Sequence, residues 1–397
     1  MKKHGIDIKI LLNRMNNKQF RLAIVVFSIM LINGLAFNGC SNNNDSSLTN
    51  VVVLDAPIKQ QIRTESLDLN QLYEEITIVE LEDNEGEDLI GIIRDIKSVD
   101  KYIFVCDERA IHIYDINGSF VSVIDRRGRG RGEYLSLSCF DIDKESRRII
   151  IYDSTQKKLL YYSYDGSFIK EQDCNGGLLI SEFAVLQNGE FIFYYNHYDD
   201  IGNRGLWLAD SNGIFKQQLI DFNESYRSAI VKDKYLVHIN DNSIGYIGDE
   251  DKNVINTIVG DSIVKEYQIK CDIKIPKRLM RKKLLSDNDM KKIFFKGGYL
   301  ETDNTLFFDM VTGDGNGYTM IVDKLSNKAY RIYDNKDIIV SGEAKIVPNF
   351  RFSDHNKLIG FYLPTTILKY EILRNRFPNI NEDSNPVLFL VTTKSIH

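Results

Sequence analysis

The chain has 397 residues, a length that suits two or three average domains or one large all-β ring. Hydrophobic residues make up 43% and charged residues 27%, which is typical of a soluble globular protein and excludes extensive disorder. The net charge is −6 although residues 1–21 are basic, so the rest of the chain is strongly acidic. An acidic body lacks the basic surface that phosphate backbones require, so we expect no nucleic-acid partner.

Residues 1–39 have the order of a secretory signal peptide. The basic residues 1–21 precede the uncharged apolar run 22–37, which is followed by Asn38 and Gly39. The apolar run is shorter than the roughly 20 residues that a membrane-spanning helix needs. We therefore predict a leader that is removed from the mature protein.

Gly39 followed by Cys40 resembles the signal of bacterial lipoproteins, in which the cysteine is lipidated and becomes the mature N-terminus. The resemblance implies a protein anchored in the cell envelope, with the outer membrane as the expected site, and residues 40–50 as a polar tether. An uncleaved anchor and a cleaved, soluble secreted protein remain as alternatives. Neither the periplasmic nor the outer face of the membrane is favoured.

Four further cysteines could pair as disulfides in an exported protein, although their spacings are irregular. Cys106 and Cys139 lie in apolar, strand-like runs, so small buried core residues are the simpler expectation. The chain has no Cys-x-x-Cys motif that would indicate a zinc or redox site. The remaining two cysteines are Cys174 and Cys271.

An internal repeat dominates the middle of the chain. Residues 102–124, 148–170 and 190–216 each contain three short apolar runs, and one further run precedes each segment. The turn glycines Gly118 and Gly166 recur at a spacing of about 48 residues, a period typical of propeller blades built from four strands. The repeat therefore predicts an all-β propeller.

Five repeats and two leftover segments predict six blades over residues 51–397. Residues 357–362 and 386–392 can supply inner strands of a closing blade, and residues 51–54 and 75–80 can supply an outer strand. The ring would then be closed by both ends of the chain, although five or seven blades remain alternatives. Short helical insertions are expected at residues 274–289 and 365–374, in the late blades.

Several motifs resemble the six-bladed β-propeller lipoproteins of Bacteroidetes, a family related to the NHL-repeat propellers. Residues 128–134, Gly-Arg-Gly-Arg-Gly-Glu-Tyr, resemble that family's Gly-x-Gly-Pro-Gly-Glu-Tyr loop, with Arg131 where proline is usual. Asp107 and Asp153 match the aspartate after the second strand of an NHL-like blade, and Asn385-Pro386 also matches. The resemblance implies the fold and an envelope location, but no reaction.

Candidate ligand-binding residues gather at the rim where blade connections and the loops between second and third strands meet. Arginine side chains on a glycine-rich loop suit carboxylates, and Tyr134 could stack on a sugar ring. The alternative is a structural loop that turns the chain between blades. The candidate residues are Asp107, Arg126, Arg129, Arg131, Glu133, Tyr134, Asp153 and His197.

No catalytic motif is present, because the sequence lacks HExxH, GxSxG and Walker A patterns. Histidines are few, and His238 and His355 have no partner by spacing. No cofactor is identified, although Ca²⁺ could be held by residues 249–251 or 314–316, whose acidic turns have low specificity. The sequence therefore leans away from an enzyme.

The function favoured by the sequence is a binding or interaction module, with a saccharide, a peptide or an envelope protein as partner. The rival is a lyase or hydrolase acting on a saccharide or peptide in the central tunnel, and a purely structural scaffold is a third possibility. The fold does not choose among them. Titratable groups with perturbed pKa values at the tunnel mouth would favour the enzyme, and a filled tunnel without a pocket would favour the scaffold.

Replacing Cys40 by alanine should block lipidation and leave unprocessed precursor, because only the thiol can carry the lipid. Incorporation of a labelled fatty acid and partitioning into detergent measure the effect, with Cys174→Ala as the matched control that should be lipidated normally. A Cys40→Ala protein that is processed and partitions like wild type would show that the lipoprotein prediction is wrong.

Overall fold

The computed structural model describes residues 49–55, 72–83, 89–174, 179–195, 204–221, 234–247, 254–270, 294–312, 317–332, 348 and 350–395. The chain divides into two compact units, residues 1–47 and 48–397, and every described residue belongs to the second. The predicted leader, Cys40, Cys271, the insertion at residues 274–289 and both candidate calcium turns lie outside the described residues.

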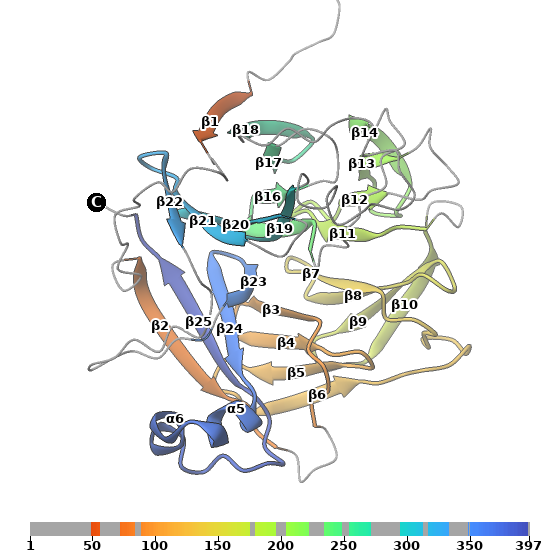
Figure 1. Cartoon of the computed structure of the whole chain (residues 1–397). Coiled ribbons are helices and arrows are strands. Elements are labelled where there is room, and N and C mark those ends of the chain that lie inside the picture. The colour runs from red at the N-terminus through yellow and green to blue at the C-terminus, as the bar shows by residue number, and fades with distance from the viewer. Residues whose placement is uncertain are drawn as a thin grey trace, which may run out of the picture. The chain divides into compact units, whose positions relative to one another are not determined.

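The described residues form six sheets, the blades of a six-bladed β-propeller, each built on four antiparallel strands, with a fifth strand added to one of them (Figure 1). Blade 1 contains β3 (Asp95–Val99), β4 (Tyr102–Cys106), β5 (Ile111–Asp115) and β6 (Phe120–Ile124). Blade 2 contains β7 (Cys139–Asp143), β8 (Arg148–Asp153), β9 (Lys158–Ser163) and β10 (Phe168–Asp173). Blade 3 contains β11 (Glu182–Val185), β12 (Phe191–Tyr195), β13 (Gly205–Ala209) and β14 (Phe215–Asp221).

The later blades follow the same plan. Blade 4 contains β15 (Leu236–Asn240), β16 (Ser243–Tyr246), β17 (Val254–Val259) and β18 (Ser262–Lys270). Blade 5 contains β19 (Phe294–Glu301), β20 (Thr305–Thr312), β21 (Gly317–Asp323) and β22 (Lys328–Ile332). Blade 6 contains β23 (Phe350–Asp354), β24 (Lys357–Tyr362), β25 (Val387–Thr393) and β2 (Tyr73–Glu80).

The burial of the strands decreases from the centre of the ring outward. In blade 2, β8 is almost entirely buried and reads as a continuous apolar run, whereas the outer strand β10 alternates between half-buried and exposed residues. The first strands of neighbouring blades touch in the order β3, β7, β11, β15, β19 and β23, and β23 touches β3 again. The ring is therefore closed, with the first strands around its axis.

Each blade is apolar on both faces and packs against both neighbours. Phe104 of blade 1 and Phe140 of blade 2 share one buried cluster, and comparable clusters join each of the other neighbouring pairs. Burial of one such side chain contributes about 1.5–3 kcal/mol. A single blade would leave these faces in water, so the blades depend on the closed ring.

The closing blade combines both ends of the described chain. β2 pairs with β25 in antiparallel register from Tyr73 opposite Thr393 to Glu80 opposite Val387. The turn at Gly118 of blade 1 packs against β2, and a Cβ at this glycine would lie 2.1 Å from the carbonyl oxygen of Glu80. The positive φ of Gly118 and this close approach explain the glycine in the repeat.

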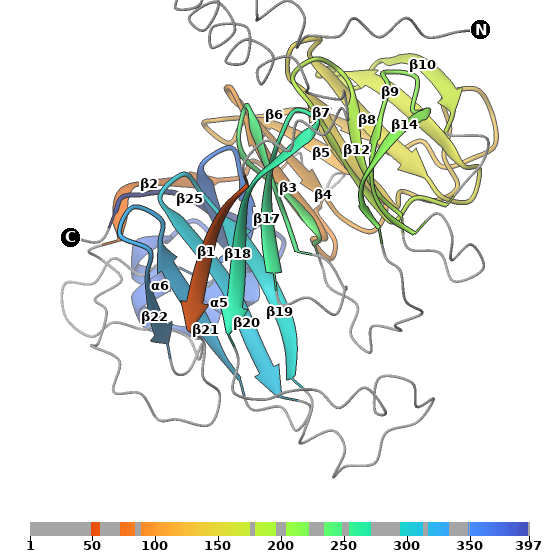
Figure 2. The same cartoon turned by 90° about the horizontal axis from the view of Figure 1, so that it is seen from above.

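The strand predicted at residues 51–54 forms, but it does not lie in the closing blade where the sequence pattern places it. β1 (Asn50–Asp55) does not join the closing blade but pairs in parallel with β18, as a fifth strand on the outer edge of blade 4 (Figure 2). The pattern of residues 51–54 predicts a strand correctly. It carries no information on the partner, because the choice depends on contacts far along the chain.

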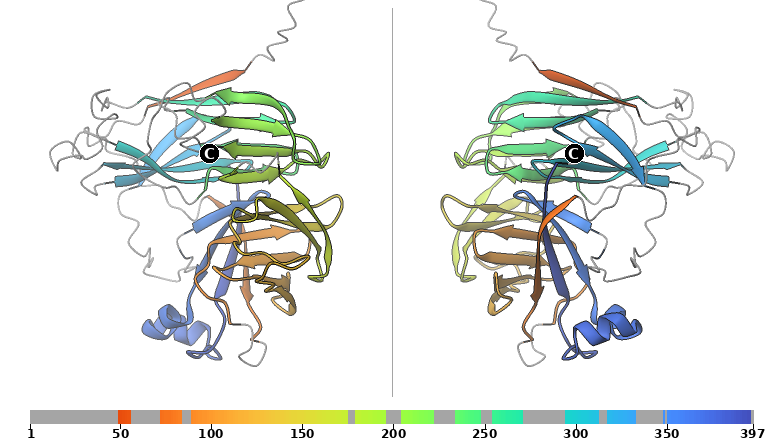
Figure 3. Two further views of the ribbon diagram at one scale, coloured as in Figure 1. Left: turned by 90° about the vertical axis from the view of Figure 1, so that its right-hand side faces the viewer. Right: turned by 90° about the vertical axis from the view of Figure 1, so that its left-hand side faces the viewer.

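Two short helices, α5 (Pro364–Lys369) and α6 (Glu371–Arg376), lie between β24 and β25, where a helical insertion was predicted (Figure 3). Ile367 and Leu373 pack with Phe389 of β25.

No helix in the described part of the chain is long and apolar enough to cross a membrane. The described cysteines Cys106, Cys139 and Cys174 are unpaired thiols.

Removing residues 50–82 should destabilise the whole ring, whereas removing only residues 50–55 should have a much smaller effect. The longer deletion exposes the edge of β25 and removes the buried Val79 and Leu81, each of which contributes about 1.5–3 kcal/mol. Thermal unfolding of both proteins measures the difference. Equal melting temperatures for the longer deletion and the parent would contradict closure through β2.

Candidate functional site

Charged side chains fill the axis of the ring instead of leaving it open. They stand on the first strands of the blades, where the surrounding residues are apolar and buried. Because these strands run in the same direction around the axis, residues at matching positions lie in layers. The buried charged and imidazole groups on these strands are Asp95, Lys97, Asp141, Asp143, Glu182, His238, Glu301 and Asp354.

Lys97 is the centre of the main layer. Its ammonium lies 2.8 Å from Asp141 Oδ1 and 3.9 Å from Asp354 Oδ1, so one lysine of blade 1 contacts carboxylates of blades 2 and 6. The amides of Val185 and Ser98 also donate to Asp141 and Asp354, at 2.6 and 3.0 Å. Ion pairs and backbone donors together stabilise both carboxylates in their ionised form.

The pKa values of this layer move away from neutrality. Burial would raise the pKa of Asp141, but His238 and Lys97 outweigh it and hold that pKa far below its ordinary value. Burial would likewise raise the pKa of Asp354, but His355 and Lys97 lower it to about 2. Burial would lower the pKa of Lys97, but Asp141 and Asp354 raise it well above its ordinary value. These groups remain charged at neutral pH.

Two histidines complete the layer, which corrects the expectation from spacing that they have no partner. The rings of His238 and His355 stack with their centroids 4.7 Å apart and their planes 11° apart. His238 Nε2 lies 2.7 Å from Asp141, and His355 Nδ1 lies 3.0 Å from Asp354. The amide of His355 also donates to the His238 carbonyl oxygen, so β15 and β23 meet across the axis.

The pKa of His355 is raised by its position in this layer. Burial would lower its pKa below 6.5, but the Asp354 carboxylate outweighs burial and raises it. The contribution of protonated His355 to stability is therefore complete below pH 6.5 and is lost as the pH rises through the raised pKa. The contribution of Asp354 is present above pH 3.8 and is lost as the pH falls through about 2.

A second layer lies at the start of the first strands. The Lys234 ammonium lies 2.5 Å from Asp95 Oδ2 and 3.4 Å from Glu182 Oε1, joining blades 1, 3 and 4. The amide of Tyr235 donates to Glu182 at 2.7 Å. Burial raises the pKa of Glu182, with Lys234 opposing the rise. This layer also fills the axis with paired groups.

One rim of the ring, here called the turn rim, consists of the turns joining first to second and third to fourth strands. Lys144 of blade 2 bonds both carboxylate oxygens of Asp241 of blade 4, at 2.9 and 2.8 Å, and lies 3.6 Å from Asp100 of blade 1. Asp303 of blade 5 accepts from Asn240 and donates its amide to Asn356. These contacts close the axis at the turn rim.

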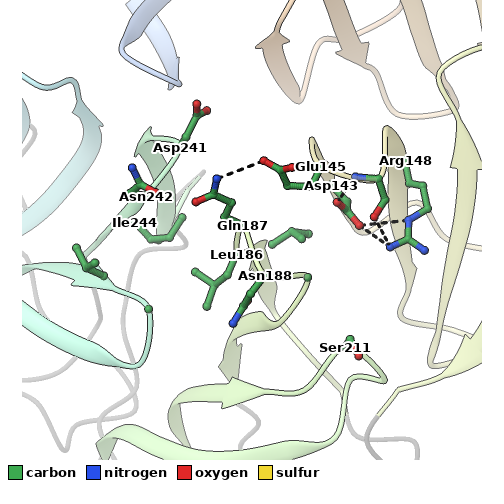
Figure 4. Close-up of a pocket in the computed structure, with 15 residues that line it drawn as sticks. Asp143, Glu145, Arg148, Leu186, Gln187, Asn188, Ser211, Asp241, Asn242 and Ile244 are labelled. Carbon is green, nitrogen blue, oxygen red and sulfur yellow. Dashed lines mark hydrogen bonds and ion pairs between the residues drawn. The ribbon is translucent and has the colours of Figure 1, made fainter.

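A pocket of about 780 Å³ opens on the turn rim beside this closure, between blades 2, 3 and 4 (Figure 4). Its size lies within the range typical of small-ligand sites. Buried Val185, Leu186 and Ile244 provide an apolar lining. The polar lining residues include Glu145, Arg148, Gln187, Asn188, Asp241 and Asn242.

Several polar side chains in the pocket already have partners. Arg148 forms an ion pair with the buried Asp143 through Nη2 at 2.6 Å, and Gln187 donates to Glu145 at 3.3 Å (Figure 4). Towards the axis, a cavity of about 20 Å³ reaches His238 and His355. That volume suits about one water molecule.

The predicted site residues that the structure describes lie at the opposite rim, here called the connection rim, where several of them hold the loops together. Asp107 Oδ1 accepts the amides of Arg109 and Ala110, and Asp153 makes the same contacts with the amides of Thr155 and Gln156. The second carboxylate oxygen of each aspartate accepts an amide from the incoming connection. Both aspartates are buried.

Tyr134 is fully buried, so its ring offers no exposed stacking surface. Its hydroxyl donates to carbonyl oxygens of the neighbouring blade, at 2.7 and 2.9 Å. Glu133 accepts the amide of Gly130 at 2.7 Å, which fixes the arginine loop. Arg126, Arg129 and Arg131 are exposed on this loop. His197 lies outside the described residues.

The turn-rim pocket and the axial charges were missed by the sequence search. A usable signal is the charged or imidazole residue that recurs at the third position of an apolar first strand, as in Lys97, Asp141 and His238.

Within the described residues, no group of three or more potential ligands is arranged to hold a metal ion. His112 hydrogen-bonds with Asp107 at 3.1 Å inside its blade.

The family model described as a domain of unknown function, DUF4934, matches residues 50–392. The chain belongs to the DUF4934 family. This match spans the described propeller almost from end to end, so β1 and the closing blade are parts of the DUF4934 domain. No curated protein has a significantly similar sequence.

The solved structures that resemble this DUF4934 chain include two from Bacteroides species. A "putative exported protein" of Bacteroides fragilis has 18% identity and a TM-score of 0.64, over 87% of this chain and 100% of that chain. A member of the DUF4221 family from Bacteroides vulgatus has 11% identity and a TM-score of 0.46, over 82% of this chain and 98% of that chain. The first similarity supports the same fold and assigns no ligand.

Replacing Lys97 by methionine should lower the free energy of unfolding by about 3–5 kcal/mol, because Asp141 and Asp354 would remain buried without their cation. Lys144→Met is the matched control, since its ion pair is partly exposed and should contribute at most about 1 kcal/mol. Urea unfolding at pH 7 measures both. Equal losses for the two variants would contradict a central role for Lys97.

Proposed function

We propose that this chain is an exported, lipid-anchored propeller of the cell envelope that binds a saccharide or a peptide at a rim of the ring. The observation that carries the proposal is the contrast between a filled axis and an open pocket beside it. Ligand sites in proteins are concave, with a few polar groups around an apolar lining. The turn-rim pocket meets this description.

Binding accounts for the axial charges better than catalysis in a tunnel does. A general acid or base needs a pKa near the working pH and access to substrate. Lys97, Asp141 and Asp354 have pKa values displaced away from neutrality and are buried in mutual ion pairs. These groups suit a structural role, which leaves recognition to the rims. The pocket likewise favours binding over a purely structural scaffold.

Export and anchoring rest on the N-terminal sequence and on the description of a similar structure. Residues 1–39 and Cys40 have the pattern of a lipoprotein signal, and the similar Bacteroides fragilis chain is described as exported. We therefore propose the membrane as one partner, through lipid at Cys40, with the outer membrane as the location. Fatty-acid labelling of Cys40→Ala tests this part independently of ligand binding.

The arginine loop is a second proposed contact surface. Among the described residues, Arg126 and Arg129 have no carboxylate partner, and Arg131 lies over the ring of Phe168. Arginine side chains on a fixed loop suit an anionic group on a ligand. Asp107, Glu133, Tyr134 and Asp153 would then support the loop instead of contacting ligand.

A binding screen with glycans and peptides should separate the two rims. Ser211→Trp places a large ring at the edge of the turn-rim pocket and should abolish binding there, with little effect on folding because Ser211 is exposed. The triple variant Arg126→Gln, Arg129→Gln and Arg131→Gln should keep the melting temperature and lose only salt-sensitive binding of anions.

The outcome assigns the site directly. We expect Ser211→Trp to remove the main ligand and the triple variant to leave it bound. The proposal fails if no glycan or peptide binds, or if hydrolysis or elimination of a bound ligand is detected. Binding that is lost in the triple variant alone would move the site to the arginine loop.

A further inference from the structure

Most of the charged side chains that line the turn-rim pocket are already paired. Arg148 pairs with Asp143, and Lys144 pairs with Asp241 through two contacts below 3 Å. Among the described residues, Glu145 is the lining carboxylate without a cationic partner, and it accepts a hydrogen bond from Gln187. A strongly charged ligand would therefore find little opposite charge to compensate its lost hydration.

The hydrogen-bonding groups that remain are planar and include both donors and acceptors. Glu145 supplies acceptor oxygens, Arg148 supplies donors, and the amide of Asn242 supplies both. They come from blades 2 and 4, and they are separated by the turn that carries Gln187 of blade 3 (Figure 4). Adjacent hydroxyl groups, each of which donates and accepts, match such a set better than a single charged group does.

The walls of the pocket do not suit an extended peptide. Peptides that add to a sheet need an unpaired strand edge, whereas hairpin turns supply the polar wall here. None of the lining residues in the described part of the chain is aromatic, and the apolar ones form a surface of the buried Val185, Leu186 and Ile244 and the exposed Val259. This surface can cover the C–H face of a sugar ring but offers no deep side-chain pocket.

We infer that the turn-rim pocket binds an uncharged oligosaccharide. The inference rests on the proposed function, because it names the ligand class of the same pocket. Hydroxyl groups would bond to Glu145, Arg148 and Asn242, and the aliphatic surface would pack against carbon atoms of the ring. Since no ion pair with the ligand is involved, binding should change little between low and high salt.

The test is a binding panel on the full-length chain. It contains neutral gluco-, manno-, galacto-, xylo- and fuco-oligosaccharides, an oligogalacturonate, a chitosan oligomer and an unstructured decapeptide. We expect at least one neutral oligosaccharide to bind, and Glu145→Ala and Asn242→Ala each to weaken that binding about tenfold or more. Glu371→Ala on α6 is the matched control and should bind as wild type does.

Each result decides a different point. Neutral binding that resists salt and is weakened by both pocket variants supports the inference. Binding of only the oligogalacturonate, the chitosan oligomer or the decapeptide, blocked by Ser211→Trp, overturns the inference while the proposed function stands. Neutral binding that neither pocket variant changes also overturns it, and absence of binding by every probe overturns both. Melting temperatures of the variants equal to wild type exclude misfolding as the cause.

Discussion

The ion pair between Lys97 and Asp141 is the interaction on which the centre of this propeller depends. It lies where the first strands of the blades converge, and it is extended by Asp354 and by the stacked rings of His238 and His355. Apolar clusters join neighbouring blades, whereas this layer and the second layer around Lys234 connect blades across the axis. Buried charges are costly without partners, so the layer requires its contributing strands to be in place together.

Filling the axis has a consequence for function. Because paired side chains occupy the axis, we propose that a ligand is recognised at the rims and not in a central channel. The two rims differ in chemistry. The turn rim has a pocket in which Arg148 and Asp241 are already paired, whereas the connection rim presents arginines on a loop fixed by Glu133 and Tyr134.

The sequence predicts what depends on local pattern. The repeat of four short apolar runs gives the blades, and residues 365–374 give the helices beside β25. Pairings between distant segments are not local, which is why β1 was placed in the closing blade instead of on β18. The spacing of His238 and His355 likewise gives no sign of their partners, because these lie on distant strands. Asp107 and Tyr134 matched a motif whose residues stabilise loops, so the motif indicated the fold more than the site.

The central claim is tested most directly by NMR titration of the His355 imidazole in the folded protein. The account predicts that His355 titrates above pH 6.5, because the Asp354 carboxylate outweighs the effect of burial. The midpoint of this titration, which gives the pKa of His355, should move to lower pH when Asp354 is replaced by asparagine. A pKa at or below 6.5 in the unmodified protein, with no response to Asp354→Asn, would contradict a charge-paired axis.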